Sequence, residues 1–158
     1  MSIMSIFTNM RFKNEMNQVM KIVKTIFTIG IVATFLDILT TWIFVNKYGV
    51  EYEANIFFRK LMHVIGVENA LLINAVISIL TLTILYMYFH KARNIKIKMF
   101  IEGLIYGFSI PRILPVINNF LFLTIGISFY NIALPLTVII TLPFAIYITS
   151  KYWKKHTN

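Results

Sequence analysis

Long apolar runs alternate with short polar segments along this chain. Four of the runs, residues 26–45, 70–89, 100–123 and 130–148, are long enough to cross a membrane as helices. A hydrocarbon core of about 30 Å takes roughly 20 helical residues. We therefore predict an all-α fold: an integral membrane bundle of four transmembrane helices, formed by residues 1–158 as a single transmembrane domain.

The segment between the first two runs is too polar to span a membrane and too apolar to be a plain loop. Within residues 52–66, large apolar side chains recur at helical spacing, namely Ile56, Phe57, Leu61, Val64 and Ile65. This pattern predicts a short amphipathic helix, interfacial or re-entrant, at the outer surface. Gly49 and Gly66 are expected to mark its two ends.

The basic residues predict how the helices are oriented. The chain has 15 lysines and arginines and a net charge of +9. Most of them lie before the first run, between the second and third runs, or after the fourth: Arg11, Lys13, Lys21, Lys24, Lys91, Arg93, Lys96, Lys98, Lys151, Lys154 and Lys155. The positive-inside rule then places both termini in the cytoplasm, against the anionic inner leaflet of a cell membrane. Residues 1–25 would be a cytoplasmic or interfacial segment and residues 149–158 a basic cytoplasmic tail.

Composition narrows the class of protein. Hydrophobic residues make up 58% of the chain and charged residues only 13%, which a water-soluble domain of this size could not accommodate. The basic clusters are separated by apolar runs and do not gather on one face, so we do not expect nucleic-acid binding. The chain has no cysteine, and its three histidines lack ligand spacing, so we expect no metal site and no cofactor.

Polar residues inside the apolar runs mark the candidate site. Asp37 lies near the middle of the first run, and Thr40 and Thr41 follow one turn later. A central aspartate opposes insertion by about 2.5–3.5 kcal/mol, so a role other than insertion must explain it. A polar stripe on the second run, Asn74, Ser78 and Thr81, is expected to share one helix face.

The third run carries the strongest helix-breaking signal. Pro111, Arg112 and Pro115 lie near its middle, so we predict a kinked helix that depends on its neighbours for stability. Gly103 and Gly107, four residues apart, are expected to let a neighbouring helix approach closely.

The two intramembrane charges are predicted to lie at the same depth. Asp37 is eleven residues and Arg112 twelve residues from the inner start of its run, and a helix rises about 1.5 Å per residue. We hypothesise that they pair inside the bundle. Such a pair could serve a function or simply hold the helices together.

The remaining polar groups converge on the outer half of the bundle. Asn118 and Asn119 are expected near the depth of Asn74, beneath the loop that carries Glu53, Asn55 and Arg59. We therefore expect a polar pocket that opens outward. The candidate constellation is Asp37, Thr40, Thr41, Glu53, Asn55, Arg59, Asn74, Arg112, Asn118 and Asn119.

Several of these residues also have simpler explanations. The serines and threonines could do no more than help helices pack, and Glu53 and Arg59 could be an ordinary loop pair. Glu102, near the inner interface, is expected to be a surface charge. No catalytic residue is predicted.

A motif in the first half of the chain resembles a known pattern. The sequence is D-I-L-T-T from Asp37, then Gly49, then E-A-N-I-F-F-R from Glu53 to Arg59. It resembles a family of small uncharacterised multi-pass membrane proteins of archaea and bacteria with the pattern D-x-x-T-T … G … E-x-N-P-x-x-R. The likeness covers residues 34–123, where Arg112 and the Asn118–Asn119 pair resemble a polar stretch of that family. Ile56 stands where the family has proline.

The resemblance implies one constellation of residues and no particular activity. Its members would be Asp37, Thr40, Thr41, Glu53, Asn55 and Arg59. The leading functional hypothesis from the sequence is a structural or accessory component that works beside other membrane subunits or by self-association. The alternatives are a transporter or channel-like protein for a polar or ionic solute, and an intramembrane enzyme acting at the lipid interface.

Overall fold

The computed structural model describes residues 3–127, which are helical and contain no strand within that range. In chain order the elements are α1 (Ile3–Tyr48), η1 (Val50–Tyr52), α2 (Ile56–Ile65), α3 (Val67–Lys91), α4 (Ile95–Ser109), η2 (Ile110–Arg112) and α5 (Ile113–Ile125). Three segments are long and apolar enough to cross a membrane: Asn17–Tyr48, Val67–Lys91 and Ile95–Ile125. The all-α prediction is confirmed. The predicted fourth span, residues 130–148, and the tail, residues 149–158, lie outside the described residues.

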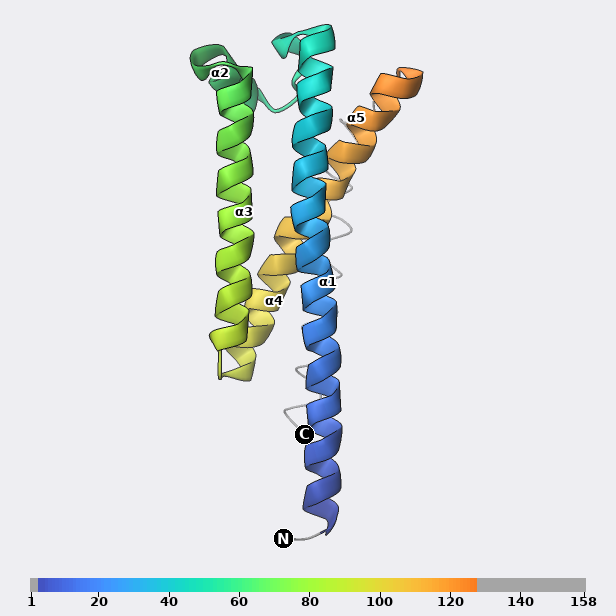
Figure 1. Cartoon of the computed structure of the whole chain (residues 1–158), viewed down its shortest axis with the longest axis vertical. Coiled ribbons are helices and arrows are strands. Elements are labelled where there is room, and N and C mark those ends of the chain that lie inside the picture. The colour runs from blue at the N-terminus through green and yellow to red at the C-terminus, as the bar shows by residue number, and fades with distance from the viewer. Residues whose placement is uncertain (1–2, 128–158) are drawn as a thin grey trace.

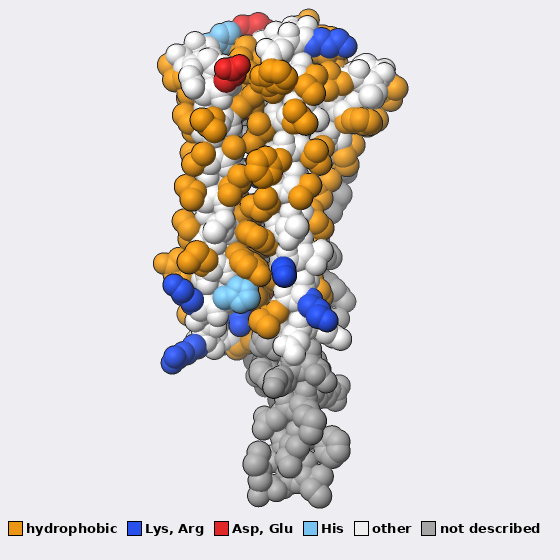
Figure 2. All heavy atoms as spheres, viewed as in Figure 1, with side chains coloured by type: hydrophobic (Ala, Val, Ile, Leu, Met, Phe, Trp, Pro, Cys, Tyr) orange, Lys and Arg blue, Asp and Glu red, His pale blue; other side chains and the backbone are white. Residues whose placement is uncertain are grey.

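The three long segments form a splayed bundle. In Figure 1, α1 and α3 run alongside each other, while the α4–η2–α5 segment crosses them obliquely and α5 diverges from α3. We call the end that carries α2 the α2 end. The opposite end, where Lys21, Lys24, Lys91, Arg93 and Lys96 lie, is the basic end. Figure 2 shows most Lys and Arg side chains near the basic end, acidic side chains at the α2 end and an apolar surface between them.

The first helix is longer than the predicted span. It begins at Ile3 and continues without a break to Tyr48, so the predicted N-terminal segment and first span belong to one helix. Residues 3–25 contain no proline or glycine that would end the helix before the apolar run begins.

The third long segment is broken where its prolines predicted. Proline has no backbone N–H, and its ring clashes with the carbonyl four residues earlier, so an α-helix cannot pass Pro111 unchanged. Here η2 replaces one turn of α-helix at Ile110–Arg112. Pro115 then lies in the first turn of α5, where an N–H has no partner within the helix. The predicted kink is confirmed.

Particular residues define both ends of helix α2. Its N-cap is Asn55, whose side chain accepts hydrogen bonds from the backbone N–H groups of Phe57 and Phe58. It ends at Gly66, whose φ of 86° lies in the left-handed region that favours glycine, and α3 starts at the next residue. The turn after Asn55 therefore forms with isoleucine at position 56.

The apolar residues from which α2 was predicted divide between two sides of the helix. Phe58, Leu61, Met62 and Ile65 pack toward the bundle, whereas Ile56, Phe57 and Val64 are exposed. Both sets follow helical spacing, so the sequence pattern alone did not show which of them would meet α1 and α3.

Two apolar clusters close the bundle at its ends. The cluster at the basic end joins α1, α3 and α4 through Val19, Val23, Phe89, Ile101 and Ile105. The cluster at the α2 end joins α1, α2 and α3 through Phe44, Val45, Met62, Ala70 and Leu71. Asp37 and Arg112 lie along the helices between these clusters, whereas Glu53, Asn55 and Arg59 lie in the loop and on α2 at the α2 end.

The close helix contact occurs at a glycine other than the predicted pair. A Cβ on Gly30 would lie 2.3 Å from Ser109 Oγ and 2.8 Å from Ser109 Cβ, so α1 and α4 touch at this position. No described atom lies within 4 Å of a Cβ placed on Gly103 or Gly107, so the described helices make no close approach there.

We expect Gly30→Ala to destabilise the bundle by about 1–3 kcal/mol, because the added methyl group forces α1 and α4 apart. The free energy of unfolding in mixed detergent micelles measures the change. Gly103→Ala is the matched control: it adds the same methyl group to a helix where no described atom opposes it, and it should leave the stability unchanged. Equal stability of Gly30→Ala and the wild type would contradict the close contact.

Candidate functional site

A pocket of about 270 Å³ lies at the α2 end, between α1, α3 and α5 and beneath the loop that precedes α2. Its polar lining consists of Asp37, Thr41, Glu53, Asn55, Asn74, Asn118 and Asn119. Its aromatic lining consists of Phe44, Tyr52, Phe58 and Phe122. Toward this end of the bundle α5 diverges from α3 (Figure 1). Most of the candidate constellation therefore surrounds a single cavity.

An asparagine amide ties α5 to the polar turn of α1. Asn119 Nδ2 donates to Thr41 Oγ1 at 3.0 Å and to Thr40 Oγ1 at 3.3 Å. Thr41 Oγ1 in turn donates to Asp37 Oδ1 at 3.5 Å. Thr41 thus connects the asparagine of α5 to the carboxylate of Asp37 on α1, whereas Thr40 donates to the backbone carbonyls of Leu36 and Asp37.

Arg112 lies deeper than the pocket lining and reaches α3. Its Nη2 donates to Ser78 Oγ, and Ser78 Oγ donates to Asn74 Oδ1 at 3.3 Å. Asn74 lines the pocket, so the guanidinium is connected to the pocket through two side chains of α3.

The hypothesis of a direct Asp37–Arg112 pair needs correction. Both side chains face the bundle interior, and the charge of Arg112 acts on the Asp37 carboxylate. No ion-pair contact joins the two residues, however, because the guanidinium is turned toward Ser78. Helix rise predicted their shared depth, but it contains no information on the direction in which each side chain points.

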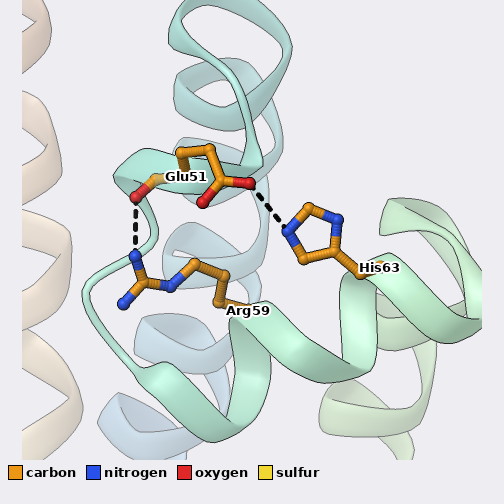
Figure 3. A network of polar contacts seen from close by, with 3 residues as sticks. All are labelled: Glu51, Arg59 and His63. Carbon is orange, nitrogen blue, oxygen red and sulfur yellow. Dashed lines mark hydrogen bonds and ion pairs between the residues drawn. The ribbon is translucent and has the colours of Figure 1, made fainter.

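The loop above the pocket is braced from α2. Arg59 Nη1 donates to the backbone carbonyl of Glu51 at 3.0 Å, and His63 Nε2 lies 3.0 Å from Glu51 Oε1 (Figure 3). Arg59 therefore contacts the loop backbone and makes no direct pair with Glu53. Arg59 does not line the pocket, but it stabilises the loop that covers the pocket.

Glu53 closes the same loop from the pocket side. Its Oε1 accepts the backbone N–H of Asn55 at 2.9 Å, which places the carboxylate beside the N-cap of α2. Burial raises the pKa of Glu53, while the Asn55 N–H and the charge of Arg59 oppose that rise. Glu53 therefore picks up a proton at a higher pH than a solvent-exposed glutamate does.

Sequence reasoning missed a polar stripe on α4. Glu102 was expected at the surface, but it is only 4% exposed and accepts a hydrogen bond from the Tyr106 hydroxyl at 3.2 Å. Ser109 is fully buried one turn farther along. The spacing of Glu102, Tyr106, Ser109 and Arg112, which repeats every three or four residues, was the signal available in the sequence.

The chemistry of the pocket favours a cationic or polar ligand. Two carboxylates and four amide side chains supply hydrogen-bond acceptors, and four aromatic rings share the lining. No group of three or more His, Asp or Glu side chains within the described range could hold a metal ion.

No protein-family model matches this chain, and no curated protein or solved structure is similar to it. The family resemblance of the D-x-x-T-T … E-x-N motif stays a prediction. The structure does place physical roles on the motif residues: Asn55 caps α2, Arg59 braces the loop, and Asp37 and Glu53 line the pocket.

Proposed function

We propose that this chain is a multi-pass protein of the cell membrane that binds a small cationic or polar solute in the pocket, as part of a transporter or channel-like system. One observation carries the proposal: Asp37 and Glu53, from separate elements, line the same cavity together with four asparagines. A carboxylate at membrane depth, facing the interior of a helix bundle, is typical of ion and solute pathways.

The proposal includes an orientation. Lysines and arginines of the described residues gather at the basic end, as Figure 2 illustrates, and such clusters face the cytoplasm in membrane proteins. The α2 end and its pocket would then face outward. Both termini would be cytoplasmic, the C-terminus through the fourth span expected at residues 130–148.

The absence of cysteine allows a direct test with single-cysteine variants. Asn74→Cys places a thiol in the pocket lining, and Val76→Cys places one on the exposed apolar side of the same helix. Membrane-impermeant methanethiosulfonates, one bearing a trimethylammonium group and one a sulfonate, are applied to intact cells. Each rate is normalised to that of a free thiol.

We expect the cationic reagent to modify Asn74→Cys about tenfold faster than the anionic one, because the pocket carboxylates concentrate cations. Tetramethylammonium, added as a competing cation, should slow the reaction. Val76→Cys should react with neither reagent, because a thiol in lipid seldom ionises. Equal rates for the two reagents at Asn74→Cys would refute the proposal. So would a rate at Asn74→Cys that tetramethylammonium does not change.

The accessory role expected from the sequence remains a second candidate. Gly103 and Gly107 on α4 have no described atom against them, and Phe100 and Phe108 beside them are exposed. Small residues four apart on a membrane helix allow another helix to approach closely. Co-purification of a membrane subunit at fixed stoichiometry would favour this role, which is compatible with solute binding.

A further inference from the structure

A second row of polar groups continues from the pocket toward the basic end. On α4 and η2, Glu102, Tyr106, Ser109 and Arg112 follow one another at intervals of three or four residues, so they share a helix face. All four are buried or half-buried. Glu102, Tyr106 and Ser109 do not line the pocket, and they lie on the side of it toward the basic end.

Glu102 is the member of this row that lies farthest from the pocket, and its surroundings are mostly apolar. Its neighbours along α4, Ile101 and Ile105, belong to the apolar cluster at the basic end. The Tyr106 hydroxyl donates to it, and the charged groups of α1 and α3 make no ion pair with it within the described residues. A carboxyl group in the interior of a membrane bundle opposes insertion, so it is by default a candidate for function.

Ser109 lies between Glu102 and Arg112 and has an unused hydroxyl. It is fully buried, and its Oγ has no hydrogen-bond partner among the described residues. Facing it on α1 is Gly30, and one turn toward Asp37 on the same helix lies the fully buried Thr34, whose hydroxyl donates to the Gly30 carbonyl. A buried hydroxyl without a partner calls for an explanation, and a bridging water or a transferred proton supplies one.

Arg112 and Asp37 form the other end of the row. Asp37 is influenced by Arg112, by Glu53 and by the Thr41 hydroxyl, and α3 faces this region with the neutral side chains of Asn74 and Ser78. The positive charge of Arg112 stands between the pocket and Ser109. A fixed positive charge at this point opposes the free passage of protons. Proton movement past Arg112 would therefore be coupled to another event, such as cation binding in the pocket.

We propose that this polar row carries protons between Asp37 and Glu102 and exchanges them for the cation that binds in the pocket. The inference rests on the proposed function and names its coupling ion. When a cation settles beside Asp37, the carboxyl O–H bond breaks and its proton passes to a bridging water. Each water or hydroxyl oxygen then accepts one proton and releases another, until an O–H bond forms on the Glu102 carboxylate. One positive charge enters the pocket for each proton that leaves it, and no electron is transferred.

The test uses the purified full-length chain in liposomes that contain a pH-sensitive dye. A gradient of tetramethylammonium, a permanently charged ion that does not cross lipid unaided, should drive proton movement in the opposite direction. Glu102→Gln keeps an acceptor oxygen for Tyr106 but cannot carry a proton, and it should slow this movement at least about tenfold. Glu68→Gln, which neutralises an exposed acid in the first turn of α3, is the matched control and should behave like the wild type.

Ser109→Ala is a second variant, which tests the proton route in case Glu102→Gln slows proton movement only by disturbing the fold. It removes a hydroxyl that holds no described hydrogen bond, so the fold should persist while proton movement slows several-fold. Wild-type rates in both variants would overturn the proton route. If tetramethylammonium protects Asn74→Cys but drives no proton movement, the coupling fails and the proposed function stands. If it does neither, the proposed function fails as well.

Discussion

Asp37→Asn should abolish the preference of the pocket for cations. The substitution keeps the size of the side chain and an oxygen that can accept from Thr41 Oγ1, and it removes one of the two carboxyl groups that can carry a negative charge beside a bound cation. Loss of a charge that contacts a bound cation in a desolvated site costs about 2–5 kcal/mol, so affinity for tetramethylammonium should fall by at least about 30-fold.

The measurement is the concentration of tetramethylammonium that halves the modification rate of Asn74→Cys, compared with and without Asp37→Asn. Glu51→Gln is the control, because it removes an equal charge at the same end of the bundle from a carboxylate that faces His63. Glu51 does not belong to the pocket lining, and its loss should change the half-protecting concentration less than about twofold. An Asp37→Asn variant that still binds the cation with wild-type affinity would exclude Asp37 as the binding group.

Arg112→Met should lower the stability of the folded bundle by about 3 kcal/mol, although it makes the helix easier to insert. The substitution removes the hydrogen bond to Ser78 and leaves Asp37 without the positive charge that acts on it. The isolated span, by contrast, gains about 2.5–3.5 kcal/mol in insertion free energy. The two effects have opposite signs, so insertion efficiency and the free energy of unfolding separate them.

A double variant tests whether the two charges act together. Asp37→Asn in the Arg112→Met background removes the uncompensated carboxylate and should recover part of the lost stability, with a coupling energy of about 1 kcal/mol or more. Thr28→Val combined with Arg112→Met serves as the control pair, since Thr28 hydrogen-bonds within α1 and lies on an exposed face. Additive losses for Asp37 and Arg112 would show that the field between them contributes nothing.

The features of this structure that depend on local sequence could be predicted. The apolar runs determine the helices, because a span must satisfy all its backbone hydrogen bonds internally. The prolines at positions 111 and 115 likewise determine the break in the third segment, since the missing N–H is a local property of the residue. The start of α2 was predicted wrongly: Gly49 was expected to mark it, but Gly49 directly follows α1, and Asn55 caps α2.

The grouping of the polar residues was also within reach of the sequence. Helix rise alone gives the depth of each side chain, and depth was enough to predict that Asp37, Asn74 and Asn118 would lie near one cavity. What depth omits is rotation about the helix axis. That omission explains why a direct Asp37–Arg112 pair was expected, although Arg112 is turned toward Ser78.

Contacts between helices were decided only by the tertiary structure. Gly30, Gly103 and Gly107 are equivalent in the sequence, but only Gly30 meets a described side chain of another helix, because α1 and α4 cross at that position. Ser109 is buried at that crossing, and Glu102 is buried seven residues earlier on α4. By itself the sequence determined which segments are helical, where one of them breaks and how deep each polar group lies. The packing angle between the helices decided which of those groups touch, since that angle depends on many weak contacts spread over both surfaces.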